Sequence, residues 1–321
     1  MIIAPESDLE SIVAYSMQDA DEYANGAVAL VAGWVEQTVV LCGEERARAD
    51  VVDAVRDNLS IDSAAAHVLT SDAFLMLEHR ATVCGEGICY QVSRDLVRPT
   101  VDWGDNVPSA FCVYLDSQRR RLRWYRKAGF AKNGFGIQGE LFELFVVEAL
   151  AHMGWRAERT GWGGGRLSRA KEIVRQVAAW IDGTARESEL SKWIPRSAKD
   201  AKLDLVCQAD FYDGRGLRPT FLVQCASGAN WKDKTGSPSV RTWSRVIATG
   251  TQLSRGFAMP HLVDEYEFDR AGVDSGALFL DSTRLLSAGA CDGGDWLSEQ
   301  LRKRIARWLR PRIHALAGTF G

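Results

Sequence analysis

The chain has 321 residues, 46% hydrophobic and 25% charged, with a formal net charge of −3, which is the composition of a globular protein with room for two domains. No apolar run has the roughly 20 residues of a membrane-spanning helix, and the first residues lack the basic and apolar segments of a signal peptide. Seven scattered cysteines without a CxxC pair argue against a disulfide framework or zinc site, so we expect reduced thiols in a cytoplasmic protein without a membrane partner.

Charge is distributed unevenly along the chain. Residues 1–117 carry 20 acidic and 6 basic side chains, whereas residues 118–321 carry 22 acidic and 33 basic ones. A split this large predicts two functional parts. The basic part could face a polyanion such as DNA, and the acidic part could dock a protein partner or fold back over the basic surface. We therefore expect an acidic domain (1–117), a basic linker (118–133) and a second domain (134–321).

The acidic domain is expected to be α+β. Apolar residues at helical spacing predict a helix over 7–34, and an acidic helix is expected over 43–59. Apolar and β-branched runs predict strands over 35–42, 87–92 and 110–115. No motif with a chemical role and no family resemblance is found in this part.

The linker interleaves basic and aromatic residues. Such a segment can grip phosphates and stack on bases, but a basic segment that pairs with the acidic domain fits the same pattern. Asn133–Gly136 predicts a turn and a domain boundary. The candidates for nucleic-acid contact in the linker are Arg121, Arg123, Trp124, Arg126 and Lys127.

A buried helix over 139–153, with Gly154 as its C-cap, is expected to open the second domain. Glu140 and Glu143 lie three residues apart and therefore share a face of that helix. Glu140 also fits an exposed carboxylate at a helix start, whereas apolar neighbours make a purely solvated role less fitting for Glu143. A strand over 156–160, a helix over 167–181 and a loop over 184–199 follow.

Two strands then carry one notable polar residue each. Alternation along 200–210 places Leu203 and Leu205 on one face and Asp204 on the other. After a turn at 213–216, the apolar run 221–226 contains the amide of Gln224, which must find a partner because an unpaired buried amide is costly. A hairpin would bring Asp204 and Gln224 side by side.

The remaining chain is expected to alternate loop, helix and strand. We expect a loop over 227–238, a helix over 240–253, an edge strand over 257–263 around Pro260, a strand over 277–281 with a helix start at Asp281 or Ser282, and an amphipathic helix over 296–309. Basic residues in the loop and the first of these helices are further candidates for nucleic-acid contact: Lys232, Lys234, Arg241 and Arg245.

The polar residues of the second domain suggest a metal site. The carboxylates of Glu143 and Asp204 and the amide oxygen of Gln224 are hard ligands that suit Mg²⁺ or Mn²⁺. A metal held in this way can polarise a phosphodiester and lower the pKa of a bound water. A lysine two residues after Gln224 would lie on the same face and stabilise the charge of the transition state, but the sequence has Ala226 at that position.

These residues resemble the motifs of the PD-(D/E)XK nuclease superfamily, most closely the Mrr-like restriction endonucleases and more distantly the archaeal Holliday-junction resolvases. Phe142-Glu143 is similar to the family's opening helix, Asp200-Ala-Lys-Leu-Asp204 to its DxxxD motif, and Gln224-Cys225-Ala226 to its QxK motif. The resemblance covers about residues 134–290. It implies an α/β fold, a restriction-endonuclease-like αβα sandwich with a central mixed sheet.

The resemblance also implies an activity, namely Mg²⁺-dependent cleavage of DNA in restriction or antiviral defence. Asp204, Gln224 and Glu143 would be the metal ligands, and Glu140 a second carboxylate within reach. Ala226 stands in place of the family lysine, and three interpretations are open: an engineered replacement of lysine by alanine, a lysine that has migrated to Lys232 or Lys234, or a natural protein that only binds. The alternative functions are a non-catalytic nucleic-acid-binding subunit and an effector nuclease controlled by a partner on the acidic domain. A homodimer fits each of them.

Overall fold

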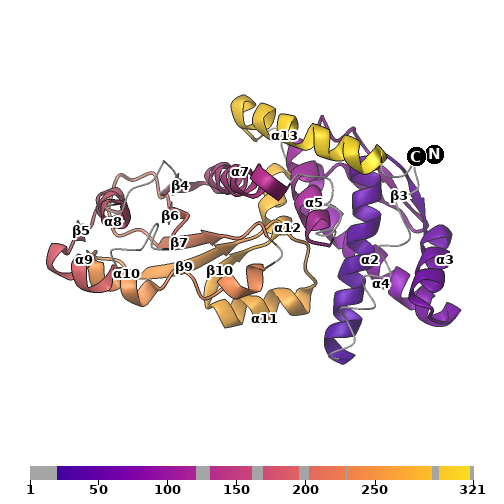
Figure 1. Cartoon of the computed structure of the whole chain (residues 1–321), viewed down its shortest axis with the longest axis horizontal. Coiled ribbons are helices and arrows are strands. Elements are labelled where there is room, and N and C mark those ends of the chain that lie inside the picture. The colour runs from indigo at the N-terminus through magenta and orange to yellow at the C-terminus, as the bar shows by residue number, and fades with distance from the viewer. Residues whose placement is uncertain are drawn as a thin grey trace. The chain divides into compact units, whose positions relative to one another are not determined.

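The computed structural model describes residues 20–120, 131–160, 169–194, 202–228, 230–290 and 296–318 (Figure 1). The chain divides into two compact units. We call residues 1–137, 260–268 and 281–321 the helical unit, and residues 138–259 and 269–280 the sheet unit. The chain therefore leaves the helical unit, builds the sheet unit, and returns to complete the helical unit at its C-terminal end.

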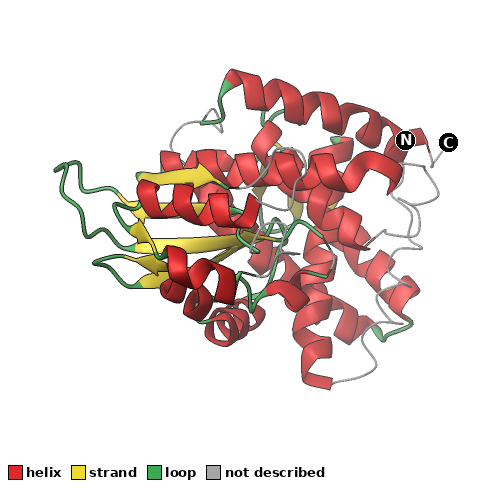
Figure 2. Ribbon diagram, turned by 60° about the vertical axis from the view of Figure 1, so that its left-hand side comes forward, coloured by secondary structure: helices red, strands yellow, loops and turns green. Residues whose placement is uncertain are grey.

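The helical unit consists mainly of helices (Figure 2). Its small antiparallel sheet has the strand order β1-β3-β2, and 3-10 turns lie at Gly85–Gly87 and Ser287–Gly289. Its helices are α2 (Ala20–Cys42), α3 (Arg48–Leu59), α4 (Ser63–Cys84), α5 (Val107–Arg120), α12 (Ser282–Leu286) and α13 (Glu299–Gly318). Its strands are β1 (Arg46–Ala47), β2 (Tyr90–Val92) and β3 (Leu96–Pro99).

The core of the helical unit combines both ends of the chain. Helix α2 contacts α4 and α5, and α13 contacts α5 and α2. Trp308 of α13 meets Phe111 and Tyr114 of α5 edge-on, with ring centroids 5.9 and 5.5 Å apart. The amphipathic helix expected over 296–309 is confirmed with other bounds, since α13 begins at Glu299 and continues to Gly318. Its buried face includes Leu301, Ile305 and Trp308. Packing thus assigns α13 to the helical unit, whereas the change in charge at residue 117 suggests a division that places it with residues 134–321.

Several expectations for this part of the chain are wrong in whole or in part. Of the strand expected over 87–92, only Tyr90–Val92 forms. Residues 35–42 form the last turns of α2, and residues 110–115 lie inside α5, so neither run is a strand. Residues 35–41 and 110–115 are buried throughout, and a short run buried on every side does not distinguish strand from helix by its pattern. The expected turn at Asn133–Gly136 lies inside α7 (Ala131–His152). The expected helix over 43–59 is shortened to α3, because residues 46–47 pair with β3.

The sheet unit contains a five-stranded sheet of order β10-β9-β7-β6-β4 (Figure 1). Strands β4, β6 and β7 are antiparallel neighbours, whereas β7, β9 and β10 are parallel, so the sheet is mixed. Strands β5 and β8 form a separate antiparallel pair. The strands are β4 (Trp155–Arg159), β5 (Thr184–Ala185), β6 (Leu205–Ala209), β7 (Thr220–Cys225), β8 (Ile247–Ala248), β9 (Leu253–Ala258) and β10 (Ala277–Leu280). The helices that lie wholly in this unit are α8 (Arg169–Trp180), α9 (Glu187–Trp193) and α10 (Val240–Val246). Helix α7 spans the boundary at residue 137, and α11 (Glu265–Ser275) spans the one at residue 268.

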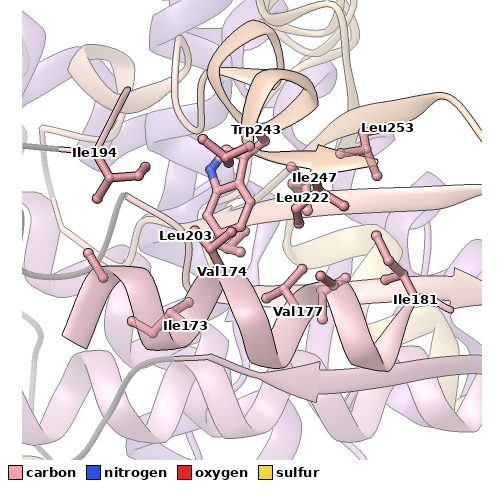
Figure 3. Close-up of a cluster of buried hydrophobic side chains, with 14 of the residues drawn as sticks. Ile173, Val174, Val177, Ile181, Ile194, Leu203, Leu222, Trp243, Ile247 and Leu253 are labelled. Atoms are coloured by element: carbon pink, nitrogen blue, oxygen red, sulfur yellow. The ribbon is translucent and has the colours of Figure 1, made fainter. Parts of the chain in front are cut away.

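One face of this sheet is covered by α8. Its apolar residues Ile173, Val174 and Val177, with Ile181 directly after the helix, recur at helical spacing and belong to a buried cluster with Leu222 and other residues (Figure 3). The cluster also takes in Leu190 and Ile194 around α9 and Trp243 of α10. The segment 184–199, expected to be a loop, therefore contributes a helix and part of the core.

The parallel side of the sheet differs from expectation in two respects. The helix expected over 240–253 ends at Val246, and β8 and then β9 follow it. Phe257 and Ala258 belong to β9, which lies between β7 and β10 and is not an edge strand. Pro260 follows the end of β9, so its missing N–H removes no hydrogen bond from the ladder. The strand expected at 277–281 is confirmed, and the Asp281 side chain caps α12 by accepting a hydrogen bond from the Arg284 N–H (2.9 Å).

Candidate functional site

The hairpin of β6 and β7 brings Asp204 and Gln224 together, as predicted. The antiparallel register pairs Leu205 with Val223, which places the preceding Asp204 opposite Gln224. The Gln224 amide donates to Asp204 Oδ2 and also to the Cys225 carbonyl (3.3 Å). The Cys225 backbone N–H donates to the same Asp204 oxygen (2.7 Å). The buried amide has therefore found its polar partner.

The entry to β6 is less regular than simple alternation predicts. Leu203 packs in the same cluster as Val206 and Leu222, although alternation places Leu203 and Val206 on opposite faces. The ladder begins only at Leu205. Before it, the Asp204 N–H donates to the Val223 carbonyl (3.2 Å), and the Asp204 carbonyl accepts from the Thr160 N–H (2.8 Å). Backbone bonds to both neighbouring strands thus fix the position of Asp204.

Helix α7 supplies the second carboxylate of the site. It ends at His152 and is followed by Gly154 at φ +84°, a conformation that favours glycine and turns the chain into β4. Glu143 lies about 13 Å back along the helix axis from His152 at ~1.5 Å per residue. Arg159 lies about 16 Å along the strand from Gly154 at ~3.3 Å per residue. The helix–strand return therefore brings Glu143 and Arg159 to the same level.

Glu143 is only 4% exposed and is bound by Arg159. The Arg159 Nε donates to Glu143 Oε2 at 2.6 Å, and its Nη1 lies 3.9 Å from Glu140 Oε1. Glu140 is the more exposed partner, with 32% of its side chain accessible. Arg159 is thus a residue of the site that no motif in the sequence indicates. Its only signal is a charged side chain on the half-buried face of β4, which it shares with Trp155 and Ala157.

The thiol of Cys225 lies within electrostatic reach of both Asp204 and the Glu143–Arg159 pair. Burial raises the pKa of this thiol well above its usual value, and the negative charges of Asp204 and Glu143 raise it further. The positive charge of Arg159 acts in the opposite direction. The two carboxylates and the guanidinium therefore lie within electrostatic reach of one buried side chain at the end of β7.

Ala226 is fully buried and follows directly after β7. Its N–H donates to the Ala258 carbonyl of β9 (2.9 Å), and its methyl group offers neither charge nor a proton. Lys232 is exposed with its ammonium 5.6 Å from the Trp231 ring centroid, and Lys234 is half-buried. A cation that contacts Glu143 comes instead from β4, as the guanidinium of Arg159.

The donor set has the right chemistry for Mg²⁺ but is arranged for other partners. Among the described residues, no group of three or more His, Cys, Asp or Glu side chains could hold a metal. Glu143 is engaged by Arg159, and Gln224 turns its NH₂ group toward Asp204. For Asp204, Gln224 and Glu143 to share an ion, the amide must rotate to present its oxygen and Arg159 must release Glu143.

Only some of the residues expected to contact nucleic acid lie in the part of the chain that the structure describes. Arg241 and Arg245 are exposed on α10, and the Arg245 guanidinium lies 5.8 Å from the Trp193 ring centroid. Arg121, Arg123, Trp124, Arg126 and Lys127 lie outside the described residues.

Comparisons of the chain with models of protein families, with curated proteins and with solved structures find no match. The structure itself shows a mixed α/β fold built from helices and a mixed sheet. No helix among the described ranges is long and apolar enough to cross a bilayer.

Proposed function

We propose that the sheet unit is a metal-dependent endonuclease domain that acts on DNA in restriction or antiviral defence in the cytoplasm. The observation that carries this proposal is the apposition of Asp204 and Gln224 at the adjoining ends of β6 and β7. Glu143 of α7 supports the proposal, because this carboxylate is buried and, like Asp204, raises the pKa of the Cys225 thiol by its negative charge.

The order of elements agrees with the fold that the motifs imply. Helix α7 precedes three antiparallel strands, β4, β6 and β7. Asp204 lies directly before β6, and Gln224 lies on β7. Helix α10 and the parallel strands β9 and β10 follow. This mixed sheet is compatible with a restriction-endonuclease-like core.

Each residue of the site would have a distinct role in the reaction. Mg²⁺ or Mn²⁺, when bound, would polarise the phosphodiester and lower the pKa of a water. Asp204 and Gln224 would hold the ion through their oxygens, and Glu143 would complete the site or orient the water. Position 226 would supply a cation to the developing negative charge, which alanine cannot do. The chain with Ala226 is therefore expected to be catalytically impaired.

A second candidate is a nucleic-acid-binding subunit without catalysis. The buried Ala226 and the engagement of Glu143 by Arg159 favour it, because neither group is then ready for chemistry. In this case the basic residues of the chain bind phosphates and the carboxylates serve the fold.

The two candidates predict different results for Ala226→Lys. We expect this variant to cleave supercoiled plasmid with Mg²⁺ or Mn²⁺ about 100-fold faster than the chain with Ala226, because a positioned cation stabilises the transition state. Ala226→Met is the matched control, since it adds similar length without charge, and Ala226→Lys combined with Asp204→Asn should be inactive. Circular dichroism checks that the variants fold. An inert, folded Ala226→Lys protein, across both metals and several DNA forms, would contradict the enzyme and leave the binding subunit.

A further inference from the structure

Arg159 occupies the centre of the carboxylate group of the proposed site. Its guanidinium bridges one turn of α7, with Nε on Glu143 at 2.6 Å and Nη1 3.9 Å from Glu140. Its side chain is 17% exposed, so this cation is mostly withdrawn from water. We infer that Arg159 is an internal counter-ion of the site, and that a divalent cation has to displace it from Glu143 in order to bind.

The physical reason for a counter-ion lies in the burial of Glu143. An ionised carboxylate that is 4% exposed is costly unless a charged partner and hydrogen bonds compensate it. Arginine keeps its charge at every accessible pH, so the compensation cannot be removed by deprotonation. Arg159 can only leave by moving, and its partial exposure shows that one side of it faces solvent.

The same charge that stabilises Glu143 opposes a metal ion. A divalent cation and a guanidinium on one carboxylate repel each other strongly at a few ångströms, even with the moderate screening of a half-buried site. Binding of the ion and the Arg159–Glu143 pair therefore exclude each other. This inference rests on the proposed function, since it concerns how the proposed metal ligands are held before the ion arrives.

The experiment measures Mn²⁺ binding without DNA, by isothermal titration calorimetry on the full chain. We expect Arg159→Met to bind Mn²⁺ at least about tenfold more tightly than the unaltered chain, because the competing charge is gone. Arg159→Lys, which keeps the charge, and Arg156→Met should stay within about twofold. Arg156 is a matched control because it lies on the exposed face of β4, with its guanidinium 4.4 Å from the Trp180 ring centroid.

A second measurement does not require the methionine variant to fold. In the unaltered chain labelled with ¹⁵N-arginine, the Nε–H resonance of Arg159, assigned with Arg159→Lys, should shift when Mg²⁺ is added. An unchanged resonance at saturating Mg²⁺, or a folded Arg159→Met protein with unchanged or weaker Mn²⁺ affinity, would overturn the inference alone. If no form of the chain binds Mn²⁺ and Ala226→Lys is also inert, the proposed function fails and the inference fails with it.

Discussion

At the scale of single residues, the helical unit buries a charged pair of its own. Arg80 of α4 and Glu36 of α2 are each 2% exposed, and Arg80 Nε lies 2.8 Å from Glu36 Oε1. Arg80 Nη1 also donates to the hydroxyls of Ser282 (2.9 Å) and Thr283 (2.7 Å). One guanidinium thus joins two N-terminal helices to α12, which lies about 200 residues further along the chain.

Removing one member of this pair is predicted to be more harmful than removing both. Arg80→Met leaves Glu36 buried without its cation and should lower the free energy of unfolding by about 3–5 kcal/mol. Arg80→Met combined with Glu36→Leu replaces the pair by apolar groups and should recover most of that loss. Urea unfolding monitored by circular dichroism measures both. A double variant no more stable than the single one would show that the hydroxyl contacts to α12, and not the ion pair, carry the stability.

At the scale of elements, β7 and β9 approach each other closely at one point. The parallel register places Gly256 opposite Val223. A Cβ atom added to Gly256 would lie 2.6 Å from Val223 Cγ2. The absent side chain therefore makes room for Val223, in the strand whose end carries Gln224.

Gly256→Ala is predicted to destabilise the sheet unit by about 1–3 kcal/mol through overpacking. Val223→Ala removes the obstructing methyl groups, so the double variant Val223→Ala/Gly256→Ala should lose less stability than the sum of the two single variants. Thermal unfolding of the four proteins gives this coupling. Additive losses would mean that the backbone of β9 shifts to accommodate the new methyl group.

The elements differ, for physical reasons, in how far the local sequence predicts them. The hairpin of Asp204 and Gln224 was predictable, because alternation and a turn signal fix its register locally. The runs 35–41 and 110–115 give no such signal, because burial on all sides removes the periodicity that separates a helix from a strand. The interior position of β9 depends on parallel pairing between segments far apart in the chain, which no local pattern encodes.

The site shows the same limit. Gln224 is a polar residue in an apolar run, so the sequence alone predicts that its side chain needs a polar partner. The sequence does not predict the partner of Arg159, because its contact with Glu143 depends on the 16-residue return from α7 through Gly154 to β4. Leu203 departs from alternation because it precedes the regular ladder, where the backbone of Asp204 bonds to Thr160 and Val223 at the entry to β6.

At the scale of the whole molecule, charge and packing divide the chain differently. The acidic residues 1–117 share the helical unit with α13, whose exposed side chains include Lys303, Arg304 and Arg307. The helical unit is therefore less one-sided in charge than its N-terminal sequence. A fragment of residues 118–321, which the charge pattern suggests as a separable basic half, would take α13 away from α5 and α2.

The packing of α13 leads to a prediction about the C-terminal end. It buries Leu301, Ile305, Trp308, Leu309 and Ile313. At about 1.5–3 kcal/mol for each buried apolar side chain, this contribution is comparable to the ~5–15 kcal/mol by which a whole domain is stable. A chain that ends at residue 297 should therefore lose the cooperative unfolding of the helical unit, bind a hydrophobic dye and lose helical signal beyond that of the deleted residues.

Two single substitutions on α13 test the same point without deletion. Trp308→Ala should cost about 3–5 kcal/mol, because it empties the space against Phe111 and Tyr114. Arg307→Ala, one residue earlier on the exposed face, should change stability by less than about 0.5 kcal/mol. Equal effects of the two substitutions, or a truncated chain that unfolds as cooperatively as the full one, would mean that residues 20–120 fold without the C-terminal helix. In that case the helical unit would be complete before the sheet unit begins, and the return of the chain would serve another purpose than its stability.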